Sequence, residues 1–185
     1  ELKAHISHGD GFWSTGDSSL TTTVNSSGTY YFDMQDKKQL LQSASFEQSS
    51  YGTYWKSPTG SNWTRTGSYS PIDSTYSIYP TYASAATLGI SEIYQDVDVS
   101  FDSLDIDSGI SKISVTGYMR GVVRYARDEG QLVVDYYDAN DVLLAQNATG
   151  FKELSDNWDY LNSSRTTPKT TRKVRVRLLV NKTNL

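Results

Sequence analysis

The chain has 185 residues, with 21 acidic and 17 basic side chains, a net charge of -4 and no cysteine. This length is enough for one domain with a real core and a short appendage. The lack of cysteine excludes a disulfide framework and a thiolate zinc site, and no apolar run is long enough for a transmembrane helix. Short alternating segments, separated by turn residues and lacking a helical period, predict an all-β protein.

Residues 1–36 divide into a polar half, broken by glycines, and one segment typical of a strand. That segment, 29–35, is rich in aromatic residues and follows an Asn-Ser-Ser-Gly turn. His5 and His8 are three residues apart, so on a strand their imidazoles would point to opposite faces. We interpret them as part of an ordinary polar loop rather than a metal site.

Residues 40–101 are expected to supply three strands. A short apolar strand at Leu40 leads to Phe46 and Glu47, and a second strand carries Trp63. Residues 68–83 read as a loop with short extended pieces. In 91–101, Ile93, Gln95, Val97 and Val99 alternate with polar residues, as in a half-buried strand.

The second half of the chain predicts a turn at 105–109, an alternating strand at 113–120, a hairpin and a final strand. The hairpin joins 131–137 to 142–145 through an Asp-Ala-Asn-Asp turn that ends at Asp141. In the final strand, 171–180, Arg175 and Arg177 alternate with valines.

Four motifs in this order resemble carbohydrate-binding modules with a galactose-binding-like jelly-roll fold. They are Phe46-Glu47 followed by Trp63-Thr64, then Gln95-Asp96-Val97-Asp98-Val99, Tyr137-Asp138-Ala139-Asn140 and the Val174–Leu178 strand. Ala44 and Asn62 depart from the family's usual Asn and Gly, and Asp141 replaces a Gly at a position of expected positive φ. The resemblance implies a jelly-roll β-sandwich of two antiparallel sheets in residues 37–185, after an N-terminal extension of residues 1–36 that carries a strand. It also implies that Trp63 is a buried packing residue.

Charge is segregated along the chain. Six acids and no base lie in 92–107, and seven bases and no acid lie in 165–182. Because the arginines of the final strand alternate with valines, we expect acidic and basic strands to face each other within a sheet, and no nucleic-acid binding.

The residues favour a non-catalytic binding protein, since no nucleophile–base pair, phosphate loop or comparable catalytic motif is present. Carbohydrate binding needs exposed aromatic rings and polar side chains that bond hydroxyls. We expect Trp55, Tyr118, Arg120, Arg175 and Arg177 to contact a glycan or polysaccharide. The last four would form one polar, aromatic sheet face, which is either a sugar cleft or an ordinary solvated surface. The expected location is extracellular or at the cell surface, without membrane insertion.

The resemblance further implies a closing strand after residue 180 and a structural Ca²⁺ bound by Glu47 and an Asp of that closing strand. Only five residues follow Val180, while Tyr30–Met34 matches the closing type at the other end of the chain. An open edge at 174–180 would pair with a free strand. Tyr30–Met34 either folds back or is donated to another copy, which we favour, and Asp33 would then complete the Ca²⁺ site. The alternative to a binding module of a larger enzyme, adhesin or viral fibre is therefore a structural subunit of a cell-surface or viral filament, fibre or layer assembled by strand donation.

Overall fold

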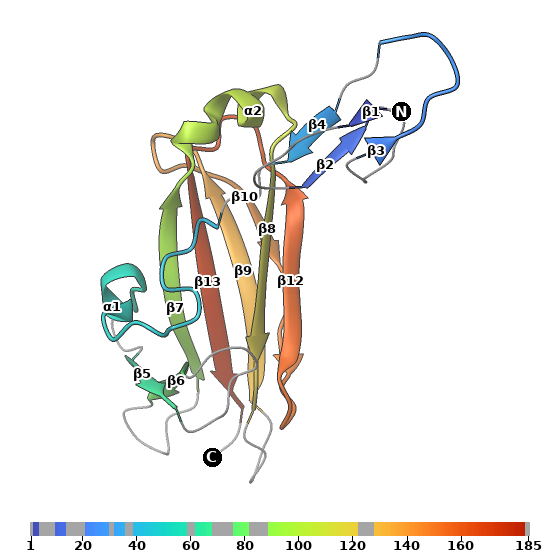
Figure 1. Cartoon of the computed structure of the whole chain (residues 1–185). Coiled ribbons are helices and arrows are strands. Elements are labelled where there is room, and N and C mark those ends of the chain that lie inside the picture. Colours follow the sequence, from blue (N-terminus) through green and yellow to red (C-terminus); the bar gives the residue numbers. More distant parts are fainter. Residues whose placement is uncertain are drawn as a thin grey trace. The chain divides into compact units, whose positions relative to one another are not determined.

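The computed structural model describes residues 2–3, 10–13, 21–29, 32–35, 39–58, 62–67, 76–81, 89–121 and 128–183. The chain divides into a small unit, Glu1–Leu40, and a large unit, Leu41–Leu185 (Figure 1). Among the described residues, no helix is both long and apolar enough to cross a membrane.

The small unit contains two antiparallel strand pairs. Strand β1 (Leu2–Lys3) pairs with β3 (Thr21–Thr22), and β2 (Asp10–Trp13) pairs with β4 (Phe32–Gln35). The predicted strand at 29–35 is thus present in β4, where it pairs with β2. His5 and His8 lie outside the described residues.

The large unit is built on an antiparallel sheet, called here the main sheet (Figure 1). Its strands follow the order β10 (Leu143–Ala148), β9 (Glu129–Tyr137), β13 (Lys173–Lys182) and β7 (Gly89–Asp98), and β11 (Lys152–Glu153) pairs with the start of β9. The β9–β10 hairpin confirms the predicted one, and Asp141 in its turn has a φ of 63°.

Strand β13 is central, which corrects the prediction of an open edge at 174–180. It pairs with β7 from Lys173 to Lys182 and with β9 from Lys173 to Asn181. Both rows of backbone hydrogen-bonding groups are therefore used within the large unit, and no closing strand is needed beside β13.

A second layer packs against one face of the main sheet and confirms the all-β sandwich. It contains the antiparallel pair β8 (Lys112–Met119) and β12 (Asp159–Thr166). A separate antiparallel pair joins β5 (Asn62–Thr66) and β6 (Ser77–Thr81). The core side chains between the layers come from every large strand: Ile93, Leu132, Val134, Tyr136, Val174 and Val176 from the main sheet, and Val115, Met119 and Leu161 from β8 and β12.

The described part of the large unit also contains three short helical segments: α1 (Tyr51–Tyr54), η1 (Ser100–Asp102) and α2 (Ser103–Ser108). Gly109 ends α2 with a φ of 86°, in the left-handed region that glycine adopts readily. The turn predicted at 105–109 is therefore the end of a short helix.

The apolar strand predicted at Leu40 is wrong, because residues 41–45 form a turn. The buried side chain of Gln95 in β7 takes the place of a neighbouring strand. Its Oε1 accepts the Gln42 amide at 2.7 Å and its Nε2 donates to the Gln42 carbonyl at 2.9 Å. Lys56 and Tyr94 exchange two backbone hydrogen bonds of 2.8 Å, so residues 41–58 are fixed to β7 at two points.

Candidate functional site

Trp55 and Trp63 differ in burial from what the sequence suggests. Trp55 is only 4% exposed, its ring lies 5.4 Å from that of Phe46, and its Nε1 donates to the Ser43 carbonyl at 3.3 Å. Trp63 is half-buried in β5, and its Nε1 donates to the Glu92 carbonyl at 2.9 Å. Trp55 is therefore a core residue and not an exposed ring for a sugar, while Trp63 is only partly buried.

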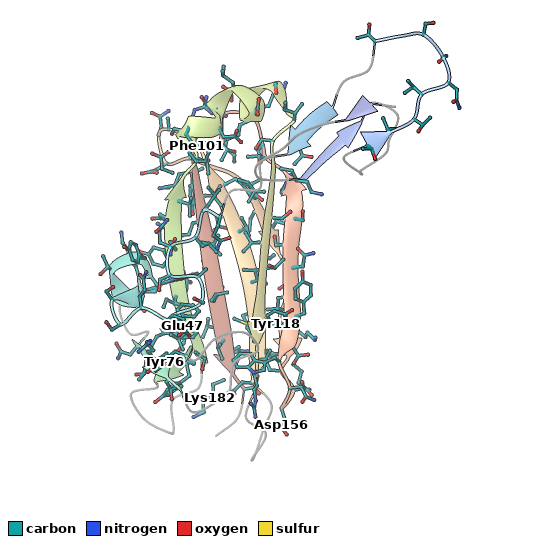
Figure 2. The ribbon with its side chains drawn as sticks, viewed as in Figure 1. Glu47, Tyr76, Phe101, Tyr118, Asp156 and Lys182 are labelled. Carbon is teal, nitrogen blue, oxygen red and sulfur yellow. The ribbon has the colours of Figure 1, made fainter. Side chains whose placement is uncertain are left out.

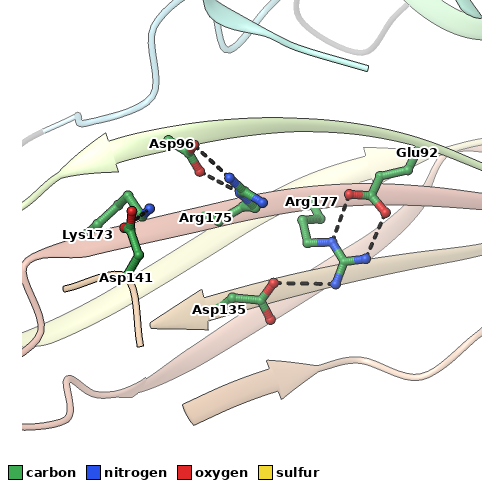
Figure 3. Close-up of polar contacts among 7 residues, drawn as sticks. All are labelled: Glu92, Asp96, Asp135, Asp141, Lys173, Arg175 and Arg177. Carbon is green, nitrogen blue, oxygen red and sulfur yellow. Dashed lines mark hydrogen bonds and ion pairs between the residues drawn. The ribbon is translucent and has the colours of Figure 1, made fainter. Parts of the chain in front are cut away.

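Arg175 and Arg177 bridge neighbouring strands on the outer face of the main sheet (Figure 3). Arg175 binds the Asp96 carboxylate through Nε at 2.6 Å and Nη2 at 2.9 Å. Arg177 binds Glu92 through Nε at 2.9 Å and Nη2 at 2.7 Å, and its Nη1 lies 3.3 Å from Asp135. These ion pairs confirm that the acidic and basic strands face each other within a sheet.

The ion pairs commit both guanidinium groups to carboxylates of β7 and β9. The hydrogen bonds from Arg175 hold the pKa of Asp96 below its usual value, although burial acts in the opposite direction. Arg175 also lies 4.3 Å from the ring centre of Tyr94 and 5.8 Å from that of Tyr137. Since the cation covers these rings, they offer less free surface for stacking on a ligand.

A second surface lies on the outer face of β8 and β12, where two tyrosine rings are side by side. Tyr118 and Tyr160 are opposite each other in the strand register. Tyr118 is 47% exposed and Tyr160 is 51% exposed, and their ring centres are 5.3 Å apart at an interplanar angle of 54°. Both residues therefore leave much of their surface open to solvent. Figure 2 labels Tyr118.

Polar residues continue from the tyrosines along the same face of the two strands. Thr116 is opposite Asn162, and the hydroxyls of Ser114 and Ser164 are 2.6 Å apart. All four residues are exposed. We call these four and the two tyrosines the Tyr118–Tyr160 surface. It combines aromatic rings with hydroxyl and amide groups on a regular strand pair.

The structure does not bring the predicted ligand residues together in one cleft. The inner face of β12 packs against the inner face of the main sheet, with Arg165 5.6 Å from the ring centre of Tyr136 and Asn147 donating to Ser163 at 2.9 Å. Tyr118 therefore lies on one outer face of the sandwich, where the exposed Arg120 follows β8, whereas Arg175 and Arg177 lie on the other.

Sequence reasoning missed Tyr160, although the pattern of 159–166 contained a signal. Leu161 and Ser163 are buried and alternate with the exposed Tyr160, Asn162 and Ser164. This alternation indicates a strand with a polar, aromatic outer face. Its pairing with Tyr118 could not be read from the sequence, because it depends on the register between two strands about 40 residues apart.

The predicted metal ligands Glu47 and Asp33 belong to different units. The Glu47 carboxylate is exposed and accepts the Tyr76 amide at 2.8 Å, beside Arg65, whose guanidinium binds the carbonyl of Phe46 at 2.7 Å. Asp33 lies in β4, and its side chain is outside the described part. Within that part, no group of three or more His, Cys, Asp or Glu could hold a metal, while Ca²⁺ takes six to eight oxygens.

Comparisons with known proteins find likeness in structure only. No protein-family model matches the chain, and no curated protein matches its sequence. The enzymatically active domain of tailspike protein 4 from bacteriophage CBA120 matches 77% of this chain with a TM-score of 0.54 and 10% identity. The arabinose-bound MgGH51 α-L-arabinofuranosidase also matches 77%, with a TM-score of 0.53 and 15% identity.

A third match is the CBM22-1 xylan-binding domain of Xyn10C from Paenibacillus barcinonensis, with a TM-score of 0.46, 14% identity, and coverage of 70% of this chain and 82% of that one. The chain spans only 19% of the tailspike chain and 23% of the arabinofuranosidase chain. These two comparisons therefore show a fold shared with one part of each of two much longer proteins.

Proposed function

We propose that this chain is an extracellular, non-catalytic carbohydrate-binding module, and that it binds a glycan or polysaccharide through the Tyr118–Tyr160 surface. The observation that carries the proposal is the pair of half-exposed tyrosine rings on a strand pair lined with hydroxyl and amide groups. The order of the four sequence motifs supports the same class.

The tyrosine rings supply the apolar contacts. A sugar ring presents C–H groups on its faces, and an aromatic face covers them at little cost in conformational entropy. Because the planes of Tyr118 and Tyr160 are inclined by 54°, one flat sugar cannot lie parallel to both rings. Each ring therefore contacts a different unit, or a different side, of a bent or twisted chain.

The neighbouring polar residues supply direction and specificity. Thr116 and Asn162 are two residues along the strands from the tyrosines, about 7 Å away at the usual rise per residue. A hydroxyl and an amide both donate and accept hydrogen bonds, as sugar hydroxyls require. Ser114 and Ser164 extend the polar row by the same distance again. A ligand that lies along β8 and β12 thus has a ring platform at one end and hydrogen-bonding partners beyond it.

The test is a glycan array followed by titration calorimetry on the best ligand. Tyr118→Ala and Tyr160→Ala should each weaken binding at least tenfold, about 1.4 kcal/mol. Tyr54→Ala is the matched control, because Tyr54 is exposed to a similar degree but lies in α1. Binding that survives both substitutions but is lost on Arg175→Ala would place the site on the opposite face. The absence of any ligand, together with concentration-dependent assembly, would favour the fibre or filament subunit.

A further inference from the structure

Three large apolar side chains are exposed at the end of the large unit that carries α2. Phe101 is 61% exposed, Leu104 is 86% exposed and Ile110 is 73% exposed, all within ten residues. On its inner side, α2 already packs into the core through Ile106, which is fully buried. Single exposed apolar side chains are common on proteins, whereas a cluster of them marks a contact surface.

A second exposed apolar segment lies next to the first. Val142, Leu143 and Leu144 follow the turn of the β9–β10 hairpin and are all exposed. Asp98 and Ser100, just before Phe101, line the same open pocket of about 420 Å³ as Asp138 and Asp141 of the hairpin turn. Each apolar segment is therefore adjacent in the chain to residues that line one pocket, and together we call the two segments and the pocket the α2 end.

The pocket between these segments is acidic. The Asp98 carboxylate accepts the Ser100 amide at 2.8 Å, and the Asp138 carboxylate accepts the amides of Asn140 at 2.8 Å and Val142 at 2.9 Å. These backbone hydrogen bonds hold the pKa of both carboxyl groups below the usual value, so both are ionised at neutral pH.

The cations at the pocket are already paired with other carboxylates. Lys173 binds Asp141, and Arg172 binds Asp107 at 2.6 Å. Among the described residues, neither Asp98 nor Asp138 has an ion-pair partner. The α2 end thus presents two fixed negative charges between two apolar segments.

We propose that the α2 end is a docking surface for a cationic amphipathic helix of a partner protein, one that carries Lys or Arg beside large apolar residues. Its apolar side chains cover Phe101, Leu104 and Val142, and one of its cations enters the pocket between Asp98 and Asp138. Charge complementarity selects this occupant over an acidic or purely apolar one.

The α2 end is separate from the Tyr118–Tyr160 surface. Tyr118 is six residues along β8 from Lys112, the residue nearest to α2, which is about 20 Å at the usual strand rise. Figure 2 shows Phe101 and Tyr118 near opposite ends of the large unit. A partner at the α2 end therefore leaves the tyrosine pair open, and failure of one proposal does not affect the other.

The experiment titrates the full chain with a labelled synthetic helical peptide of Leu and Lys and follows fluorescence anisotropy. Leu104→Ser and Asp138→Asn should each weaken binding at least fivefold, and Asn at 138 can still accept the turn's backbone hydrogen bonds. Asp156→Asn, an exposed acid near the opposite end of the large unit, and Tyr118→Ala should have no effect.

Three results would overturn the inference. The first is binding of the Leu–Lys peptide that neither Leu104→Ser nor Asp138→Asn weakens, which would indicate general attraction to an acidic protein. The second is equal binding of a matched Leu–Glu peptide, which would show that charge does not select the partner. The third is concentration-dependent self-association that Leu104→Ser abolishes, which would identify a second copy as the occupant.

Discussion

Trp55→Ala should be among the most destabilising single substitutions outside the main sheet. Its ring is almost fully buried against Phe46, and its indole nitrogen donates to the Ser43 carbonyl. Lys56, the next residue, carries the two backbone hydrogen bonds to Tyr94 of β7. Loss of the ring therefore empties a core site and also loosens the attachment of residues 41–58 to the sheet.

Emptying a buried aromatic site usually costs about 3–5 kcal/mol of unfolding free energy. With a urea m-value of about 1–3 kcal/mol/M, the unfolding midpoint should fall by more than about 1 M. The assay is urea unfolding followed by circular dichroism, because removal of a tryptophan alters the fluorescence signal itself. Trp55→Phe keeps most of the ring and should cost much less than the alanine variant.

Tyr54→Ala is the matched control, since its exposed ring precedes Trp55 directly in the chain. Surface substitutions of this kind usually change stability by less than about 0.5 kcal/mol. If Trp55→Ala costs less than about 1 kcal/mol, or no more than Tyr54→Ala, then Trp55 does not fill the core and residues 41–58 do not pack on the sheet in this way.

Four further predictions follow from contacts outside the proposed binding surfaces. Trp63→Ala should cost only about 1–2 kcal/mol in the same urea assay, because Trp63 is half-buried and loses mainly one hydrogen bond; a loss equal to that of Trp55→Ala would contradict this. Arg175 lowers the pKa of Asp96 in the folded state. The ion pair therefore stabilises the fold at pH values above the unfolded-state pKa of about 3.9, and this stabilisation is lost as the pH falls through the pKa of the folded state. Arg175→Met should reduce the fall in unfolding free energy on acidification, measured by urea unfolding at several pH values. An unchanged fall would show that this ion pair does not cause it. If Glu47 binds Ca²⁺, then CaCl₂ should raise the Tm and Glu47→Gln should remove the effect, whereas identical melts in CaCl₂ and EDTA would refute the site. Deleting residues 1–36 should leave a monomer with nearly unchanged Tm, measured by size-exclusion chromatography and thermal melting, because β13 is already paired on both sides; aggregation would show that the large unit needs that segment.

Alternation along a strand was the most informative part of the sequence. It predicted β7, β8 and β13, and the buried position of Ile93, Val115 and Val176 follows directly from it, whereas β9 was predicted from its content of Val and Tyr. It also indicated that Arg175 and its neighbours face an acidic strand, since a residue and its cross-strand partner share one face of the sheet. Positive φ at Asp141 was implied by the resemblance, because the family usually has a Gly at this position of the turn.

The errors concern contacts that no local pattern contains. Trp55 lies in a polar stretch and looks exposed, yet Phe46 and Ser43 cover it from a turn about ten residues earlier. The turn itself replaced an expected strand because the side chain of Gln95, 53 residues away in sequence, supplies its hydrogen bonds. Local composition reports the average environment of a segment, whereas burial is decided by which distant segment lies on it.

The position of β13 explains why the predicted sugar cleft divides into two surfaces. As a central strand, β13 receives carboxylates from both neighbours, so Arg177 is held by Glu92 of β7 and Asp135 of β9 at once. An edge strand would have left one side of each arginine open to a ligand. The same arginines that suggested sugar binding in the sequence are therefore occupied in joining strands that are far apart in the chain. Free aromatic and hydroxyl groups remain on the two-stranded side of the sandwich, at Tyr118 and Tyr160, where no ion pair between β8 and β12 covers the rings among the described residues.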